Sequence, residues 1–318
     1  SSANGATVAE NLFVELRREG ADAPLICFHP IGGDVSCYAE LVESLPAGFP
    51  VWGVQSRLLS GQEEHSNVEA MIAAYALAIR TRIPTGPYRL CGFSLGGYLA
   101  AGVAEQLESE GLPVDFVGVI DCPDYSRTAD ADIAREHLTD FILSGYQEFA
   151  RGIPYLQPIA DIDRPAFSEL AEALRRQPND PVTLLLDWLE SHKYIRGELP
   201  ELTIKTHLNR LSQHLLLVNT CTRIPRVRAP LAVWRAARGI GANGQTWRRD
   251  DDQPVSEIVL NADHSEILHQ PTVSEIARQI VVMINAYSDT PNNVGGDSHP
   301  GKPAQRKSEL ALFDLESD

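Results

Sequence analysis

The sequence predicts an α/β fold with a mostly parallel sheet covered on both faces. Short apolar segments with strand-like composition alternate with longer segments in which apolar residues recur at helical spacing. The strand segments are apolar rather than strictly alternating, which is typical of strands that lie between two layers of helices. The chain has 318 residues, enough for one large core or for a core with a smaller lid.

Seven segments are expected to be strands, and they lie at 11–19, 24–29, 49–57, 88–93, 114–122, 230–236 and 255–261. Three longer segments are expected to be helices, at 66–84, 95–111 and 272–288. In the first helix, apolar residues from Val68 to Ile79 recur at helical spacing and Pro84 ends it. In the last, Thr272 and Glu275 have the spacing of a capping box.

The stretch 128–222 interrupts this alternation and is expected to form a helical lid. It contains no convincing strand, and helical segments are expected near 131–150, 165–175, 181–193 and 202–220. A helical insertion between two strands would cover the carboxyl ends of the sheet, where α/β proteins bind ligands. Ordinary crossover helices are the alternative interpretation.

Both ends of the chain differ in composition from its middle. Residues 1–10 are interpreted as a linker and 11–287 as the α/β domain. Residues 288–318 are rich in Pro, Gly, Asn and Ser and are expected to be a flexible tail, although "ELALFDLE" could be a docking helix. The opening "SSANGATVAEN" has neither an initiator Met nor a signal-peptide pattern, so we expect a segment of a longer chain or a recombinant fragment.

Charge and cysteine content exclude several classes of protein. The formal net charge of −16 argues against binding a nucleic-acid backbone. No run of 18 apolar residues predicts a membrane span. The five cysteines are odd in number and form no CxxC pair, so we expect no metal site and no disulfide framework, as in a reducing cytoplasm.

The stretch "LCGFSLGGYLA" predicts a nucleophilic serine. Gly92-Phe93-Ser94-Leu95-Gly96 fits the G-x-S-x-G nucleophile elbow, and it stands between an expected strand and an expected helix. Small neighbours permit the tight turn on which the serine sits. The start of the helix then favours negative charge developing at Ser94.

A serine nucleophile needs a base, and the base needs an acid to orient it. Asp121 ends an apolar strand, where a carboxylate has little structural use, and Asp124 is its competitor. His264 directly follows the last expected strand, as the chain order Ser, Asp, His requires. The neighbouring Asp263 is expected to cap a turn or face solvent. The other late histidines are expected on a surface turn or in the lid helices, and they are His192, His207, His214 and His269.

The loop "CFHPIGGDVSCY" is expected to complete an oxyanion hole. One donor would be the backbone N–H of Leu95, which follows the nucleophile. The second donor is expected to be the N–H of Ile31, since the neighbouring glycines let the backbone approach the substrate. His29, at a strand end before proline, is expected to have a structural role.

Several motifs in this order resemble the thioesterase domain that ends polyketide synthases and nonribosomal peptide synthetases, an α/β-hydrolase. They are "LICFHPIGGDVSCYAELVESLPAGFPVWGVQSR", "GPYRLCGFSLGGYLAAGVAEQLESEG", "VDFVGVIDCPD" and "NADHSEIL". The resemblance is dense over 24–125 and returns around His264 and the final helix. The expected lid shows no recognisable match, and the tail after the final helix departs from the family pattern.

The resemblance implies a serine thioesterase with no bound cofactor. The acyl or peptidyl chain would arrive as a thioester on the phosphopantetheine of a carrier protein, in the same polypeptide or assembly line. Ser94 would take the chain, with His264 and Asp121 as base and orienting acid, and release would occur by hydrolysis or macrocyclisation. The alternatives are a free-standing editing thioesterase, a lipase or esterase, and a non-catalytic α/β-hydrolase scaffold.

Overall fold

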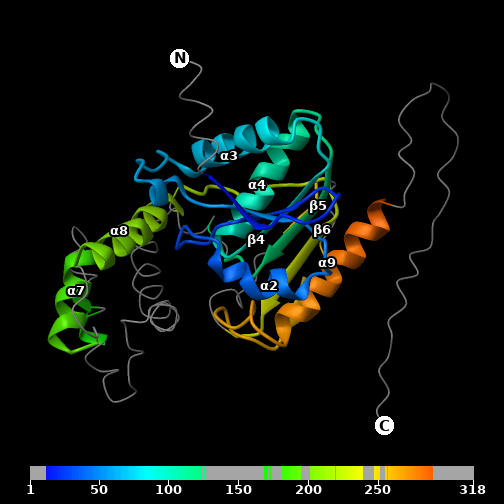
Figure 1. Ribbon diagram of the computed structural model, residues 1–318. Coiled ribbons are helices and arrows are strands. Elements are labelled where there is room, and N and C mark those ends of the chain that lie inside the picture. The colour runs from blue at the N-terminus through cyan, green and yellow to red at the C-terminus, as the bar shows by residue number, and fades with distance from the viewer. Residues whose placement is uncertain are drawn as a thin grey trace, which may run out of the picture.

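A seven-stranded sheet forms the centre of the protein, with the strand order β1-β3-β2-β4-β5-β6-β7 (Figure 1). The computed structural model describes residues 12–123, 125, 168–170, 172–173, 181–194, 201–218, 220–238, 247–250, 255 and 257–288. Only β1 pairs in an antiparallel manner; the other neighbours are parallel. The strands are β1 Phe13–Arg17, β2 Leu25–Phe28, β3 Val51–Val54, β4 Tyr88–Phe93, β5 Val114–Ile120, β6 Leu231–Ala236 and β7 Glu257–Leu260.

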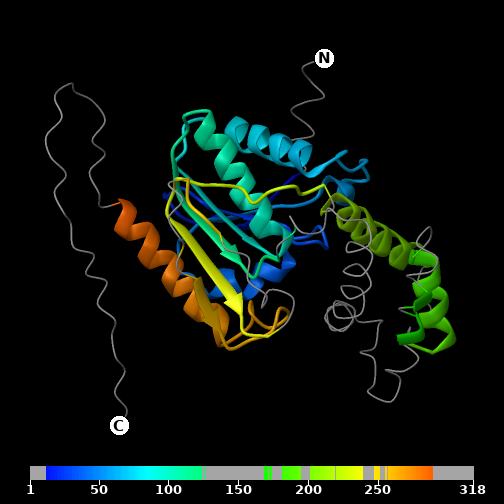
Figure 2. The same cartoon turned by 180° about the vertical axis from the view of Figure 1, so that it is seen from behind.

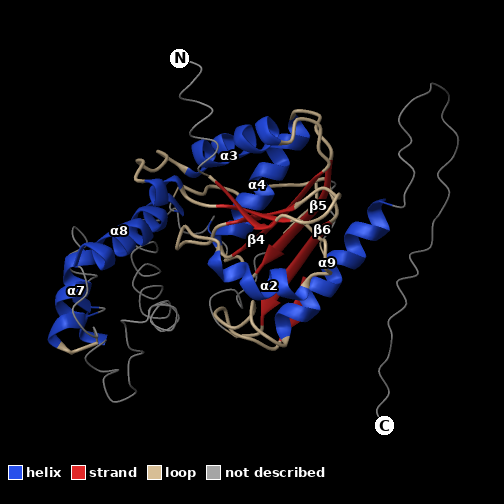
Figure 3. Cartoon of the chain, viewed as in Figure 1, coloured by secondary structure: helices blue, strands red, loops and turns tan. Residues whose placement is uncertain are grey.

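Helices cover both faces of the sheet, which confirms the predicted fold class (Figures 1 and 2). On one face lie α3 (Val68–Arg82) and α4 (Leu95–Ser109), over a core that includes Ile26, Leu90 and Val117. On the other lie α2 (Ala39–Ser44) and α9 (Thr272–Ser288), over a second core cluster. Figure 3 shows the sheet between these helices.

All seven expected strands are present, mostly a few residues shorter than predicted. The turn after β1 does not make a hairpin, because β1 pairs with β3 instead of β2. The capping-box prediction was wrong in detail: α9 begins at Thr272 itself, and Glu275 accepts hydrogen bonds from Arg278 and Gln279. Sequence reasoning also missed α2 and the 3-10 helices Ser36–Tyr38 and Arg57–Ser60, which are too short for helical periodicity to show.

Two helices of the predicted lid region lie among the described residues, α7 (Pro181–Ser191) and α8 (Glu201–Val218). Both lie on one side of the sheet, where the carboxyl-terminal part of α8 approaches it (Figure 1). The segment near 131–150 and the predicted tail 288–318, apart from Ser288 at the end of α9, lie outside the described residues. The domain boundaries, including those of the lid, therefore stay predictions.

The part of the chain that the structure describes contains no helix long and apolar enough to cross a membrane. Within the same residues, no group of His, Cys, Asp or Glu side chains could hold a metal ion. All five cysteines are free thiols. Cys27 and Cys91 occupy paired positions of β2 and β4, and burial raises the pKa of the Cys27 thiol.

The chain returns from α8 to the sheet along the side of α4. The buried carboxylate of Glu108 accepts hydrogen bonds from the N–H groups of Arg228 and Ala229, at 2.8 and 2.7 Å. Nearby, Tyr98 donates its hydroxyl to the carbonyl of Arg223 at 2.8 Å, and Arg223 also pairs with Glu105. These contacts position the segment that leads into β6, and β6 holds part of the site.

Replacing Glu108 with alanine is expected to lower the free energy of unfolding by about 2–3 kcal/mol, because two buried N–H groups lose a charged acceptor. Urea denaturation followed by circular dichroism measures the change. Glu110→Ala, which removes the exposed contacts of Glu110 with Arg80 and Gln106, is the control and is expected to cost less than about 1 kcal/mol. Equal losses in the two variants would contradict this role for Glu108.

Candidate active site

Ser94 occupies a strained turn between β4 and α4. Its backbone has φ of 55° and ψ of −127°, a conformation that residues with a side chain rarely adopt. A Cβ on Gly92 would overlap the carbonyl of Gly96, and a Cβ on Gly96 would overlap the carbonyl of Phe28. Both glycines are therefore required by close backbone approach, and the elbow predicted from G-x-S-x-G has its structural reason.

Tyr38 connects the elbow with the end of β2. Its buried hydroxyl donates to the carbonyl of Phe28 at 2.6 Å and accepts from the N–H of Phe93 at 2.7 Å. These two bonds link the last residues of β2 and β4. The loop after β2 and the nucleophile turn are thereby held beside each other.

Ser94, His264 and Asp121 form a hydrogen-bonded chain. His264 Nε2 lies 3.2 Å from Ser94 Oγ, and His264 Nδ1 lies 2.6 Å from Asp121 Oδ2. With Nδ1–H donating to the carboxylate, Nε2 carries the lone pair that can accept the serine proton. All three side chains are nearly enclosed, with exposed fractions of 2% for Ser94, 9% for His264 and 0% for Asp121.

Asp121 is fixed from the neighbouring strand β6. Its second carboxylate oxygen, Oδ1, accepts from the N–H of Ala236 at 2.9 Å, and its own N–H donates to the carbonyl of Trp234 at 2.7 Å. Its φ of 41° turns the chain away at the end of β5. The carboxylate therefore has one oxygen for the backbone and one for His264.

The other residues weighed from the sequence lie elsewhere. Asp263 caps its own turn by accepting from the N–H groups of Ser265 and Glu266, as expected. His269 is an exposed residue bonded to Glu40, which confirms the predicted surface position. His192 is exposed at the end of α7, and Asp124 and the His207 side chain lie outside the described residues.

The loop after β2 turns sharply at residues 30–33. The N–H of Gly33 donates to the carbonyl of Pro30 at 2.9 Å, and Gly33 has φ of 84°, which favours glycine. Ile31 lies within this turn and is buried, while Leu95 is the first residue of α4. Their assignment as oxyanion donors stays a prediction.

His29 supports this turn as a buried neutral histidine. Its Nδ1–H donates to the carbonyl of Pro30 at 2.7 Å, and its Nε2 accepts from the hydroxyl of Tyr75 at 2.8 Å. Burial and the nearby ring of His214 lower the pKa of His29 to about 3. The structural role expected for His29 is therefore confirmed.

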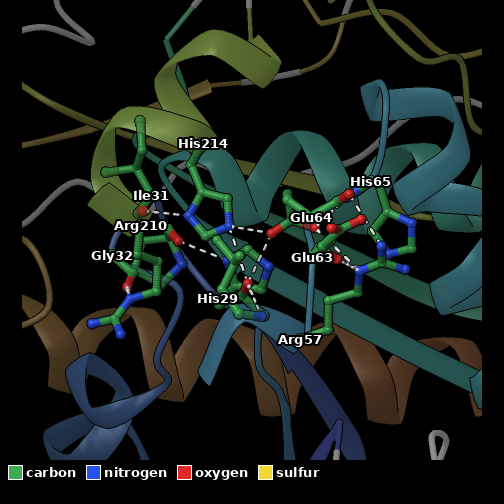
Figure 4. Close-up of polar contacts among 12 residues, drawn as sticks. His29, Ile31, Gly32, Arg57, Glu63, Glu64, His65, Arg210 and His214 are labelled. Atoms are coloured by element: carbon green, nitrogen blue, oxygen red, sulfur yellow. Dashed lines mark hydrogen bonds and ion pairs between the residues drawn. The ribbon is translucent and has the colours of Figure 1, made fainter. Parts of the chain in front are cut away.

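Sequence reasoning missed two sets of residues near the nucleophile. The buried hydroxyl of Tyr125 lies 3.4 Å from Ser94 Oγ, and burial raises the pKa of this tyrosine. His214, expected only as a lid histidine, is buried beside His29 and bonded to Glu64 (Figure 4). No local sequence motif marks Tyr125 or His214, because their contacts join segments that are distant in the sequence.

The strand order, with the serine elbow after β4 and the histidine after β7, gives the protein the α/β-hydrolase fold. Two solved structures share this fold. A four-domain nonribosomal peptide synthetase bound to AMP and glycine matches with a TM-score of 0.63 and 21% identity, over 88% of this chain and 21% of that one. The NocB thioesterase domain from the nocardicin cluster matches with a TM-score of 0.54 and 15% identity, over 86% of this chain and 99% of that one.

Residues 23–175 match the family described as "Thioesterase domain". The dimodular nonribosomal peptide synthase of Bacillus subtilis (strain 168) is 38% identical over 114 residues, which is 36% of this chain and 5% of that protein. The chain thus corresponds to a small part of the curated relatives that it matches. These findings confirm the resemblance to synthetase thioesterase domains.

The pKa of His29 is lowered to about 3 in the folded protein. The free energy of unfolding should therefore decrease as the pH falls below the pKa of an unfolded histidine. The unfolded chain takes up this proton below pH ~6.5 while the folded protein does not, so the free energy of unfolding should fall by up to about 1.4 kcal/mol per pH unit. Between pH 6 and 4.5, His29→Asn is expected to show a smaller slope than the wild type. Urea denaturation at each pH measures this, with the exposed His192→Asn as control, and identical slopes for wild type and His29→Asn would contradict it.

Proposed function

We propose that this chain is a serine thioesterase that releases an acyl or peptidyl chain from a carrier protein through an acyl-enzyme on Ser94. The observation that carries the proposal is the hydrogen-bonded chain from Ser94 through His264 to Asp121, set on a nucleophile elbow. The thioesterase family match and the synthetase relative support the substrate class. Ser94 is the nucleophile, His264 the base and Asp121 the orienting acid.

In the first step, Ser94 Oγ attacks the thioester carbonyl carbon while its proton passes to His264 Nε2. The carbonyl oxygen becomes an oxyanion, which the N–H groups of Ile31 and Leu95 stabilise. The C–S bond then breaks, and the departing sulfur takes the proton from His264. The products are a free thiol and an ester on Ser94.

In the second step, His264 removes a proton from the incoming nucleophile, which attacks the ester carbonyl. Collapse of this intermediate breaks the bond to Ser94 Oγ, and the serine regains its proton from His264. Water as nucleophile gives a free acid. A hydroxyl or amine of the bound chain gives a macrocycle.

The thiol that leaves is the phosphopantetheine arm of a carrier protein. The comparison with a larger synthase supports this partner. The B. subtilis relative is a dimodular nonribosomal peptide synthase, and this chain matches 5% of it. A carrier domain in the same polypeptide or assembly line would supply the thioester. No bound cofactor is needed, because serine, histidine and aspartate perform both steps.

The first test is covalent acylation. Wild-type protein mixed with an acyl-N-acetylcysteamine thioester is expected to gain the acyl mass by intact-protein mass spectrometry and to release the thiol. Ser94→Ala should lose the adduct and slow thiol release by about 10⁴-fold or more. Ser60→Ala, an exposed serine, should behave as wild type. Turnover of oxygen esters without turnover of thioesters would overturn the thioester assignment, and the products separate hydrolysis from cyclisation.

Asp121→Asn is expected to lower kcat by about 10⁴-fold while the fold is retained. The N–H of Ala236 requires an acceptor, so the amide oxygen of asparagine would replace Oδ1 and its NH₂ would face His264 Nδ1. The histidine would then carry its proton on Nε2 and could not accept one from Ser94.

Steady-state thiol release measures the effect of Asp121→Asn. The exposed Asp22→Asn is the matched control and should keep wild-type kcat. An Asp121→Asn variant with wild-type kcat would exclude Asp121 as the orienting acid.

A further inference from the structure

Side chains of α8 reach the turn at residues 30–33 across a long sequence separation (Figure 4). His214 Nδ1 lies 2.6 Å from the carbonyl oxygen of Ile31, and Arg210 Nε donates to the carbonyl oxygen of Gly32 at 2.7 Å. A Cβ on Gly33 would lie 2.9 Å from Arg210 Cδ and 3.0 Å from His214 Cε1. The helix is thus seated directly on the turn that carries Ile31.

Both ring nitrogens of His214 face hydrogen-bond acceptors. Nδ1 faces the carbonyl of Ile31, and Nε2 faces the carboxylate of Glu64 at 2.8 Å, and both of these groups only accept. Ser56 Oγ also lies near Nε2, but its hydroxyl donates to Glu64 at 2.9 Å. His214 is therefore placed to hydrogen-bond with the carbonyl of Ile31 through Nδ1 and with the carboxylate of Glu64 through Nε2.

Glu64 is the matching anion, with its side chain 6% exposed. Burial raises the pKa of Glu64, but the interactions with His214, together with hydrogen bonds from His65 N–H and the Ser56 hydroxyl, outweigh burial and lower the pKa to about 2.

Titratable groups near His214 include His29, stacked on it at 5.0 Å between ring centroids, and Arg210, one turn earlier on α8. Arg57 lies on the other side of Glu64, with its Nε 4.0 Å from Oε1. His29 is neutral, because its pKa is lowered to about 3.

Three successive peptide groups of the turn are held by their carbonyls. The carbonyl of Pro30 accepts from His29 Nδ1 and from the N–H of Gly33, and the next two carbonyls accept from His214 and Arg210. A peptide group is planar, so fixing the Pro30 carbonyl also fixes the direction of the Ile31 N–H. Fixing the Ile31 carbonyl holds the adjacent plane as well, so the peptide groups on both sides of the Ile31 Cα are restrained.

We infer that His214, paired with Glu64, is a positioning residue that holds the turn at residues 30–33 so that the Ile31 N–H faces the reacting carbonyl. The inference rests on the proposed function, because it assigns the N–H of Ile31 to the oxyanion. It makes α8, a helix of the predicted lid, part of the support of the catalytic centre. His214 acts through the loop and does not touch the substrate.

The test compares His214→Gln with Leu216→Gln, which places the same new residue at an exposed position two residues further along α8. With acyl-N-acetylcysteamine thioesters, His214→Gln should lower kcat by about 10–100-fold, less than loss of a whole oxyanion donor. KM should change by less than about threefold, since ground-state contacts are kept. Leu216→Gln should match the wild type in both.

Two further readouts separate positioning from a loss of folding. An alkylboronic acid forms a tetrahedral adduct on Ser94, so its inhibition constant should rise by the same factor as kcat falls. Glu64→Gln should lower kcat by less than His214→Gln does, because His214 can still donate from Nδ1 to the carbonyl of Ile31. A His214→Gln variant that loses kcat with no change in boronic-acid affinity would overturn the inference.

Hydrogen exchange followed by mass spectrometry provides a readout that does not depend on activity. His214→Gln should speed exchange of the peptide that contains residues 30–34, and Leu216→Gln should not. Unchanged exchange in His214→Gln overturns the inference whatever the activity. Failure of the proposed function looks different, since the wild type would then form no Ser94-dependent adduct while the exchange result still decides whether His214 holds the turn.

Discussion

The close approach of the first turn of α4 to the end of β2 is the constraint on which the site depends. A side chain at Gly96 would overlap the backbone of β2, and a side chain at Gly92 would overlap the backbone of α4. With both absent, the nucleophile turn and the loop that carries Ile31 lie side by side. The hydroxyl of Tyr38 then bonds both strands and sets their spacing.

Around this contact, the interior beside the sheet contains charge as well as apolar side chains. Glu64 and His214 form a hydrogen-bonded pair with little exposure, and His29 stays neutral against it. Removing charged and polar groups from water is costly, so such a pair is weak evidence for stability. Its geometry is specific instead, because both ring nitrogens of His214 and both carboxylate oxygens of Glu64 have hydrogen-bond partners.

Asp121 with His264, and His214 with Glu64, are buried polar pairs with the same arrangement of hydrogen bonds. Asp121 gives one oxygen to a backbone N–H of β6 and the other to His264. His214 gives one ring nitrogen to a backbone carbonyl and the other to Glu64. In each pair, one side chain bonds to a backbone group and to the second side chain. The backbone bond therefore sets the orientation of the whole pair.

The sequence alone determined the strand–helix alternation and the elbow at Ser94, and it predicted Asp121 and His264 as the partners of this serine. Each of these signals is local: a run of apolar residues, a pair of glycines, or a polar residue directly after a strand. The order of the motifs was also sufficient to show the thioesterase resemblance. The short helix α2 carried too few residues for a periodic signal.

Only the tertiary structure decided which distant residues meet. The bond between His264 and Asp121 joins residues 143 apart, and its distance follows from the parallel order of β5, β6 and β7. The bond from His214 to Ile31 spans 183 residues, and no pattern in α8 distinguishes that histidine from others in the region. A single histidine in a helix looks the same whether it faces solvent or a buried carboxylate, because its role depends on the residues that surround it after folding.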